Sequence, residues 1–307
     1  MTMNFEIRDK KILSSDQKNT LAGIMYIPDG DIRGIFHLVH GMTEYIGRYK
    51  ALFESLANAG YLCCGFDNLG HGNTAKAEDL GFIASKNGWQ YMVDDVKLFA
   101  DSIKSDYPDL PYILMGHSMG SFITRVAVAK HSDIADKYIC CGTAGKNPAV
   151  AAGLVICSII KAFRGERAIS PFIENMAFGS YNKRFGGNTK YEWLTKDREI
   201  IDKYATDKFC TFHFTVSAMH DLITLIKVCN SKKCFNDTKY DLPILLIAGD
   251  MDPVGNYGKG VKQVYNNFKS SGKSEVSMFL YENCRHEIHN DTCKTQMTED
   301  LLKFIAK

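Results

Sequence analysis

The chain has 307 residues, a length that fits one large domain with an insertion or two ordinary domains. Hydrophobic residues make up 45% and charged residues 23% of the chain, which excludes disordered, collagen-like and coiled-coil proteins. The formal net charge of +2 excludes the strongly basic class of nucleic-acid-binding proteins, so we expect no nucleic-acid partner.

The first residues, the most apolar stretch and the cysteines together give an expectation of the compartment. Residues 1–11 are polar and charged, and the most apolar stretch, 149–160, is too short to cross a bilayer. The ten cysteines include two adjacent pairs in apolar runs, Cys63-Cys64 and Cys140-Cys141, which fit opposite faces of a strand better than disulfides. The cysteine spacing does not match a zinc site. We therefore expect a reduced, cytoplasmic protein.

The order of predicted elements indicates the fold class. Two antiparallel strands are predicted first, and short apolar runs typical of buried parallel strands then alternate with helical spacing. The predicted strands are 4–13, 20–27, 34–41, 61–66, 112–115, 138–142, 243–249 and 275–281. The predicted helices are 49–59 and 89–107. This alternation predicts an α/β fold, with a mostly parallel sheet and helices on both faces.

The alternation breaks down between residues 146 and 240, where helix-like stretches occur without a buried-strand pattern. We interpret 146–240 as a helical insertion, called the cap below, and 1–145 with 241–307 as the core. We expect the cap to cover the carboxyl edge of the sheet, where open α/β sheets hold their active sites.

A candidate nucleophile follows the strand at 112–115. Ser118 stands in the run Gly116-His117-Ser118-Met119-Gly120, between that strand and an apolar helical stretch. In a nucleophile elbow the turn is so tight that only glycine fits two residues to either side, and the serine hydroxyl stands above the sheet. The alternative is an ordinary strand-to-helix turn with a capping serine, which the flanking strand and helix make less favoured.

A serine nucleophile needs a base, and the base needs an orienting acid. In this type of fold both follow later strands, in the order Ser, acid, His. Asp252 follows the strand at 243–249 and is preferred over Asp250, which we interpret as a turn-forming residue. His286 follows the strand at 275–281 and is preferred over His289, which we expect to face solvent.

Negative charge on the reacting oxygen requires positioned N–H donors. The backbone amide of Met119, directly after the nucleophile, is one candidate. The amide of Met42, after the first parallel strand, is the other. No metal or cofactor is required by this chemistry.

Several motifs together resemble a known family, the monoacylglycerol lipase and lysophospholipase-like branch of the α/β-hydrolases, which is also called serine aminopeptidase-like. The motifs that carry the resemblance are HGMTEY with Arg48-Tyr49 (40–49), DNLGHG (67–72), GHSMG (116–120), GDMD (249–252) and RHE (285–287). They span nearly the whole predicted core, in the family's order.

The resemblance implies roles for individual residues. Ser118, Asp252 and His286 match the catalytic triad of the family, and Met42 and Met119 match its oxyanion-hole positions. Glu44 and Arg48 match residues that support the oxyanion loop. Tyr45 is a departure, because the family usually has a histidine there.

The cap contains apolar residues at helical spacing, followed by the cations Lys161, Arg164 and Arg167. Packing of the cap on the core explains many of them. The alternative is an acyl-chain channel with an amphipathic lip that touches lipid aggregates or a membrane surface. The residues proposed to contact substrate are Leu154, Ile159, Phe178 and Phe214.

These observations predict a serine hydrolase that cleaves carboxylic esters of lipophilic acyl chains, of the monoacylglycerol or lysophospholipid type. One alternative is an aminopeptidase or amidase, for which Glu174 or Glu192 would hold a substrate amine. Another is a non-catalytic ligand-binding relative. Dehalogenase chemistry is disfavoured, because that class has Asp in place of Ser118. The oligomeric state stays open.

Overall fold

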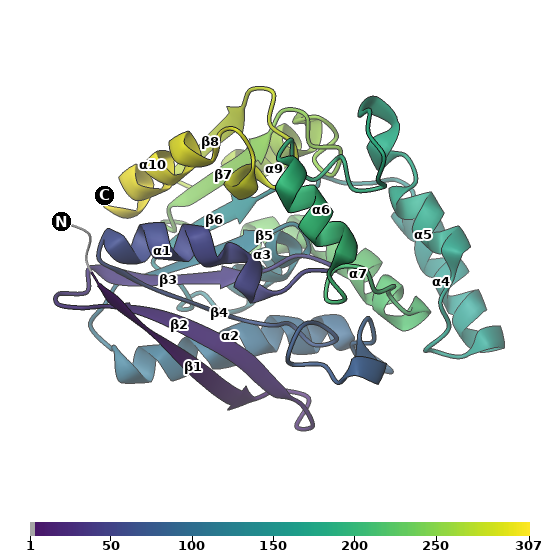
Figure 1. Cartoon of the computed structure of the whole chain (residues 1–307), viewed down its shortest axis with the longest axis horizontal. Coiled ribbons are helices and arrows are strands. Elements are labelled where there is room, and N and C mark those ends of the chain that lie inside the picture. Colours follow the sequence, from purple (N-terminus) through teal and green to yellow (C-terminus); the bar gives the residue numbers. More distant parts are fainter. Residues whose placement is uncertain (1–3) are drawn as a thin grey trace.

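The computed structural model describes residues 4–307 and contains one sheet of eight strands, drawn in Figure 1. Its strand order is β1-β2-β4-β3-β5-β6-β7-β8. The strands are β1 (Phe5–Leu13), β2 (Thr20–Pro28), β3 (Gly34–Val39), β4 (Tyr61–Phe66), β5 (Tyr112–His117), β6 (Lys137–Cys141), β7 (Ile244–Gly249) and β8 (Val276–Tyr281). All eight predicted strands are confirmed, with ends that differ by a few residues at most.

Strand direction follows the predicted pattern. β1 pairs antiparallel with β2, and β2 pairs antiparallel with β4, whereas every pair from β4 to β8 is parallel. Strands β3, β4, β5 and β7 are buried along their whole length, as expected for parallel strands covered on both faces. The mostly parallel α/β fold is therefore confirmed.

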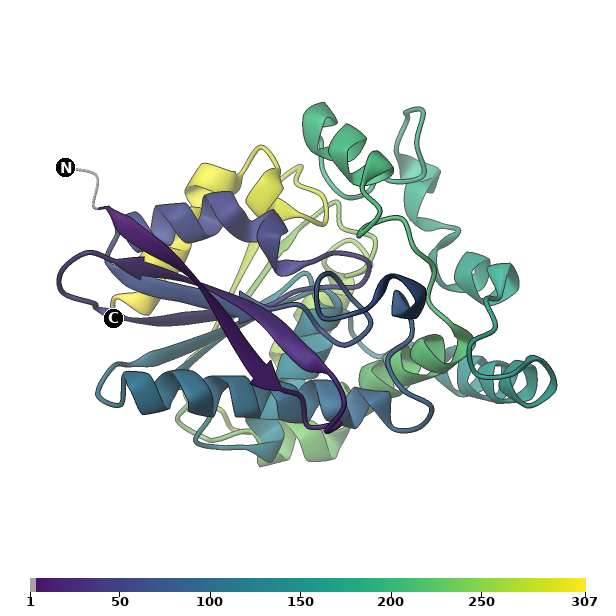
Figure 2. The ribbon, with the colours of Figure 1, turned by 60° about the horizontal axis from the view of Figure 1, so that its bottom comes forward.

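Helices cover both faces of the sheet (Figures 1 and 2). One face packs against α1 and α10, and the other against α2, α3 and α9, so that each face has its own apolar core. The helices of these layers are α1 (Lys50–Asn58), α2 (Gly88–Asp106), α3 (Met119–Lys130), α9 (Lys259–Ser270) and α10 (Lys294–Ile305). The predicted helices 49–59 and 89–107 correspond to α1 and α2.

The adjacent cysteines illustrate this division into two cores. Cys64 and Cys140 lie in the core beneath α2 and α3, whereas Cys63 and Cys141 lie in the core beneath α1 and α10. All four are buried and free, as alternation along a strand requires. Their interpretation as small core residues is confirmed.

The chain between β6 and β7 forms helices that extend beyond the sheet, at the right of Figure 1. These are α4 (Val150–Arg164), α5 (Pro171–Phe178), α6 (Arg198–Thr206), α7 (Val216–Cys229) and α8 (Lys232–Asp237). Among them α7 contacts both α4 and the core helix α3, and α8 also packs on α3. The division into core and cap stays a proposal.

Short 3-10 helices complete the secondary structure, and three of them adjoin the site described below. They are η1 (Ile46–Tyr49), η2 (Ala77–Asp79), η3 (Tyr181–Arg184) and η4 (Ile288–Asn290). Within residues 4–307, none of the helices combines the length and the apolarity that a membrane crossing demands.

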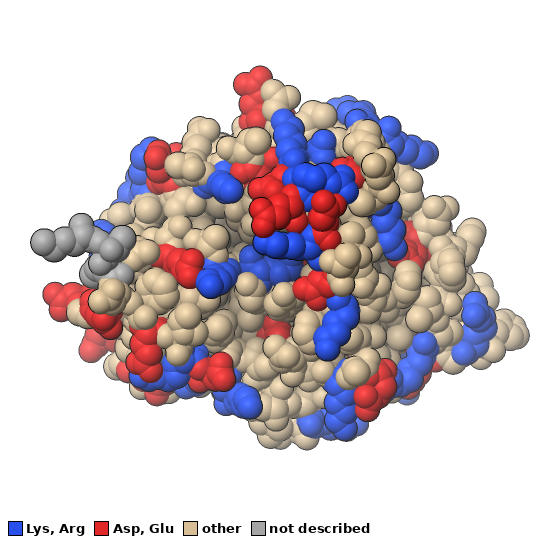
Figure 3. All heavy atoms as spheres, in the orientation of Figure 1, with Lys and Arg blue, Asp and Glu red and all other residues tan. Residues whose placement is uncertain are grey.

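Charged side chains of both signs alternate on the face drawn in Figure 3. Over α6 they form ion pairs, with 2.6 Å between Arg198 and Asp202 and 2.7 Å between Lys203 and Glu199. Exposed pairs of this kind contribute little to stability, and they leave no uniformly basic field on this face.

Candidate active site

Ser118 occupies a strained turn between β5 and α3. Its φ of 54° lies in the left-handed region, which a residue with a side chain rarely adopts. A methyl group on Gly116 would overlap the Gly120 carbonyl, and one on Gly120 would overlap the Val39 carbonyl at the end of β3. The Ser118 N–H donates to the Cys141 carbonyl at 3.0 Å, which links the turn to β6. The structure therefore has the geometry of a nucleophile elbow at this position.

Asp252 and His286 meet beyond the carboxyl ends of β7 and β8. The distance between Asp252 Oδ2 and His286 Nδ1 is 2.9 Å, and both side chains are buried. Because an ionised carboxylate only accepts hydrogen bonds, Nδ1 carries the proton and Nε2 is the nitrogen left for a reacting group. The second carboxylate oxygen of Asp252 accepts the Val254 N–H at 2.8 Å, so the acid is held from both sides.

Asp250, the alternative candidate for the acid, makes no hydrogen bond to His286. We expected Asp250 to form a turn through its side chain, but its buried Oδ1 has no hydrogen-bond partner within residues 4–307. The hydrogen bond of the turn is instead donated by the Val254 N–H to Oδ1 of Asp252.

The prediction that His289 faces solvent is wrong. His289 is buried and stacks on Tyr49 with ring centroids 4.5 Å apart, because η4 turns back beneath the site. Burial, together with the positive charge of His117, lowers the pKa of His289 to about 3.

The loop after β3 brings the second amide candidate to the serine. A Cβ on Gly41 would lie 2.8 Å from the Cβ of Ser118, so the loop passes directly over the nucleophile. The Met42 N–H has no acceptor among the described residues. Met119 is the first residue of α3, where an N–H lacks an intrahelical acceptor. Both amides are therefore free to face a developing oxyanion.

The carboxylate of Glu44 fixes the loop after β3 through several hydrogen bonds. Its Oε1 accepts the Gly41 N–H, the Tyr49 hydroxyl at 2.9 Å and Nδ1 of His117 at 3.1 Å. Burial alone would raise the pKa of Glu44, but the hydrogen bond and charge of His117, with the charge of Arg48, hold it well below its ordinary value. An ionised Glu44 can accept several hydrogen bonds at once, and this fixes the backbone of the loop.

Arg48 joins this cluster to the histidine loop. Its guanidinium contacts Glu44 at 3.1 Å and makes a bidentate pair with Glu287 at 2.7 and 2.8 Å. Burial opposes ionisation of Glu287, yet the charge and hydrogen bonds of Arg48 lower its pKa to about 2. Since Glu287 directly follows His286, the pair ties the base to the oxyanion loop.

A segment between β6 and β7 also fastens the histidine loop. The His286 N–H donates to the Trp193 carbonyl at 3.4 Å, and the Glu287 N–H donates to the Leu194 carbonyl at 2.7 Å. The Trp193 ring lies 5.0 Å from the imidazole of His286. Arg285 donates to the carbonyls of Glu192 and, at 2.8 Å, of Thr195.

Sequence reasoning missed the contributions of His117, Glu287 and Trp193. His117 and Glu287 lie inside quoted motifs, directly beside the nucleophile and the base, and that position was the available signal. For Trp193, which lies inside the predicted cap, the sequence gave no indication that it reaches His286.

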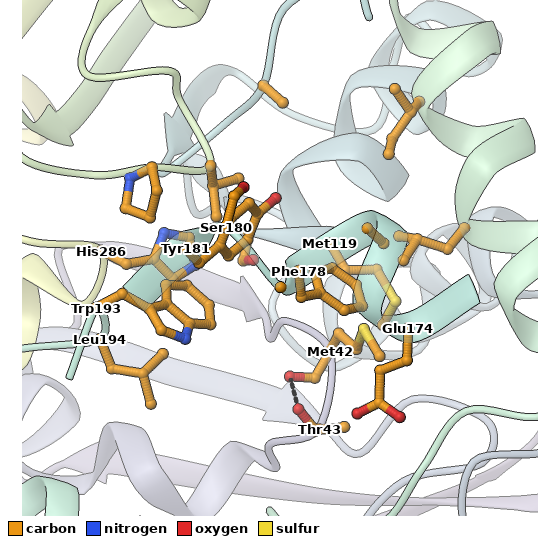
Figure 4. Close-up of a pocket in the computed structure, with 18 of the residues that line it drawn as sticks. Met42, Thr43, Met119, Glu174, Phe178, Ser180, Tyr181, Trp193, Leu194 and His286 are labelled. Atoms are coloured by element: carbon orange, nitrogen blue, oxygen red, sulfur yellow. Dashed lines mark hydrogen bonds between the residues drawn. The ribbon is translucent and has the colours of Figure 1, made fainter. Parts of the chain in front are cut away.

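One cavity of about 920 Å³ contains the candidate reacting groups, and Ser118, His286, Met42 and Met119 all line it. Figure 4 shows His286 with Tyr181 and Trp193 at one end, and Met119 and Phe178 towards the other. The cavity is large enough for a drug-sized ligand.

Of the four residues predicted to contact substrate, one lines this cavity. Phe178 lines it, whereas Leu154, Ile159 and Phe214 do not. Ile159 is 52% exposed on the outer face of α4, and Phe214 is buried against the ring of His71 at 5.3 Å. For Leu154 and Ile159 the reason is that helical spacing identifies an apolar face but not the surface that it covers. Phe214 precedes α7 and packs into the core instead of lining the cavity.

The two acids considered for binding an amine are both occupied. Glu192 is buried and accepts from Arg198 at 2.9 Å and from the Thr189 hydroxyl at 3.0 Å. Glu174 lines the cavity, but its Oε2 lies 2.7 Å from Nδ1 of His213.

Comparison with known proteins extends these observations. Residues 30–293 match the family described as serine aminopeptidase, S33. Mouse monoglyceride lipase is 24% identical over 265 residues, which cover 86% of this chain and 78% of that protein. Monoacylglycerol lipase from Mycolicibacterium smegmatis is 23% identical and covers 96% of this chain and 99% of its own.

A solved structure is more similar still. The thermostable carboxyl esterase from Bacillus coagulans, in complex with glycerol, is 28% identical, covers 98% of both chains and has a TM-score of 0.92. The match to the S33 family spans most of the chain and includes Ser118, Asp252 and His286. The chain therefore belongs to the serine aminopeptidase S33 family of the α/β-hydrolase fold and is a carboxylic ester hydrolase.

Proposed function

We propose that the protein hydrolyses carboxylic esters of lipophilic acyl chains through an acyl-enzyme on Ser118, with a monoacylglycerol or a similar single-chain ester as substrate. The observation that carries this proposal is the convergence of three elements on one cavity: the strained turn at Ser118, the hydrogen-bonded Asp252–His286 pair and an apolar wall. The lipases among the relatives support the substrate class.

The mechanism follows from the tautomer of His286. Nε2 accepts the proton of the Ser118 hydroxyl while the serine oxygen attacks the ester carbonyl. The amides of Met42 and Met119 donate to the carbonyl oxygen as it becomes negative. His286 then gives the proton to the departing alcohol, which leaves the acyl group on Ser118. Water, activated by the same histidine, releases the acid.

Apolar side chains on the outer surface of the proposed cap support contact with lipid aggregates. Val155, Phe163 and Phe172 are 59%, 87% and 64% exposed on α4 and α5. Arg164 is exposed in the last turn of α4, beside them, whereas Lys161 in the same turn donates to the Ser217 hydroxyl at 3.2 Å. A surface with apolar and basic side chains together is suited to the headgroup region of a membrane. We therefore propose that residues 146–240 act as a cap whose lip meets the lipid.

The compartment is also part of the proposal. All ten cysteines of the chain, each within the described residues, are free, and nine of them are buried. Free thiols in this number are typical of a reducing environment, so we propose a cytoplasmic location.

A series of 4-nitrophenyl esters, from acetate to long-chain acids, tests the proposed function. We expect kcat/KM to rise with chain length while the acyl group fills the cavity, and fluorophosphonate to label the wild-type protein covalently. Ser118→Ala should lose the label and lower kcat by several orders of magnitude. A strict preference for acetate would refute the lipophilic substrate, and labelling at another residue would refute the role of Ser118.

A further inference from the structure

The two ends of the active-site cavity differ in chemistry. Phe178 of α5 lies at one end, and Phe122 of α3 with Leu222 and Ile226 of α7 also line the cavity. Figure 4 shows Phe178 and Met119 on this side and His286 on the other. The apolar end suits an acyl chain. The end beside His286 suits the alcohol part of the ester, because this histidine donates its proton to the oxygen of the departing alcohol.

The connection after β6 leads from His286 to α9. A Cβ on Gly142 would lie 3.1 Å from Cε1 of His286, and one on Gly145 would lie 3.0 Å from Cα of Gly260. The next residue, Lys146, donates its N–H to Oε1 of Gln263 at 2.7 Å. Lys146 and Lys259, the first residue of α9, therefore belong to the same wall of the cavity, on the histidine side.

These two lysines carry uncompensated charge. Both side chains are exposed and line the cavity. Within residues 4–307, no carboxylate oxygen lies within 4.0 Å of the ammonium group of either lysine, so neither forms an ion pair. The acids that line the cavity are held elsewhere: Glu44 and Glu287 pair with Arg48, and Glu174 pairs with His213. Asp252 is fully buried behind His286. The positive end of the α9 dipole adds to the field.

We propose that the alcohol end of this cavity prefers a negatively charged alcohol, so that the favoured substrate is a single-chain ester of glycerol phosphate. This inference rests on the proposed function. In the acylation step the bond from Ser118 Oγ to the carbonyl carbon forms, and the bond from that carbon to the glycerol oxygen breaks. The proton taken from Ser118 passes through His286 to that oxygen, and glycerol phosphate leaves towards Lys146 and Lys259.

The test compares monodecanoylglycerol with monodecanoylglycerol phosphate, both kept below the concentration at which they form micelles. With the wild-type protein we expect kcat/KM to be on the order of tenfold higher for the phosphate ester at low salt, and the ratio to fall as salt screens the charges. The double variant Lys146→Gln/Lys259→Gln should lower this ratio clearly below the wild-type value, while Lys190, the third lysine that lines the cavity, is retained.

The matched control removes the same charge elsewhere. Lys227 on α7 and Lys269 at the far end of α9 are exposed and do not line the cavity, so Lys227→Gln/Lys269→Gln should keep the wild-type ratio. An equal or lower rate for the phosphate ester, with the neutral ester still hydrolysed, would overturn this inference and leave the proposed function intact. If neither ester is hydrolysed and fluorophosphonate does not label the protein, the proposed function itself is overturned.

Discussion

Asp252 and Asp250 stand two positions apart after β7, yet only Asp252 reaches the imidazole. Asp252 bonds His286 at 2.9 Å and is fully buried, whereas Asp250 leaves its Oδ1 without a partner among the described residues. Among residues 4–307, Asp252 is the acceptor at Nδ1 of His286, so the orientation of the imidazole depends on this carboxylate.

The first prediction concerns this bond. Asp252→Asn keeps the shape of the side chain but favours the wrong tautomer of His286, so kcat should fall by roughly ten-thousandfold with little change in folding. Steady-state kinetics on a 4-nitrophenyl ester measures the loss. Asp250→Asn is the matched control and should retain activity within a factor of a few. Comparable losses in both variants would contradict the assignment of the acid.

Among the elements, the turn from β5 into α3 depends on close approach of the backbone. Gly120 faces the Val39 carbonyl so closely that a methyl group there would overlap it. Because Val39 ends β3, directly before the loop that carries Met42, the same contact sets the distance between the two proposed oxyanion amides.

We therefore expect Gly120→Ala to affect both stability and catalysis. Relief of the overlap moves α3 or β3, which should lower the free energy of unfolding by about 1–3 kcal/mol, as overpacking commonly does. Urea unfolding measures the first effect and kcat the second. Gly186→Ala provides the control, because a Cβ at Gly186 meets nothing within 4 Å. A fully active and stable Gly120→Ala protein would be inconsistent with the described turn.

The loop after β8, which carries His286, is connected to the proposed cap by Arg285. Arg285 donates to the carbonyls of Glu192 and Thr195, and its guanidinium lies 4.6 Å from the centre of the Phe185 ring. These contacts hold the segment whose Trp193 packs on His286.

Arg285→Met should free this segment and misplace His286. We expect kcat to fall by about ten- to a hundredfold, because small displacements of a reacting group have effects of this size. Arg198→Met removes a half-exposed cation that contacts the carboxylate of Glu192 and not its carbonyl; this carboxylate keeps its hydrogen bonds from Thr189, so kcat should stay near the wild-type value. Kinetics at matched temperature, with circular dichroism to verify folding, would show whether the two variants differ as expected.

The stability of the whole molecule responds to pH through its buried histidines. His37 lies in β3, accepts the Tyr112 hydroxyl at Nδ1 over 2.9 Å and is enclosed by the rings of Phe66 and Phe99. Burial lowers its pKa from 6.5 to about 3. Between these two values the unfolded chain binds a proton that the folded protein does not, so the histidine lowers stability progressively as pH falls below 6.5.

His37→Phe should remove this pH dependence. Relative to the variant, the wild-type protein should lose about 1.4 kcal/mol of unfolding free energy per pH unit as pH falls below roughly 6.5. Urea unfolding at several pH values between neutrality and mild acid provides the comparison. Tyr112→Phe is the control: it removes the hydroxyl partner but keeps the imidazole, so its slope should stay close to that of the wild type. Parallel pH slopes for His37→Phe and wild type would refute the effect.

Local patterns in the sequence determined the fold class and the candidate reacting residues. Short apolar runs and helical spacing identified all eight strands and the order of the α/β alternation. Because parallel strands end at one edge of a sheet, residues that follow β5, β7 and β8 must converge there, and this predicted Ser118, Asp252 and His286 together. Steric demands within a few residues identified the turn at Ser118.

Only the tertiary structure decided which side chains support the site and which face its cavity. Arg48 and Glu287 are separated by 239 positions, and no periodicity reports such a contact. Leu154 and Ile159 of α4 lie in an apolar helix as Phe178 of α5 does, yet only Phe178 lines the cavity. The physical reason is that spacing along a helix defines one apolar face, whereas the surface opposite that face depends on the packing of distant segments.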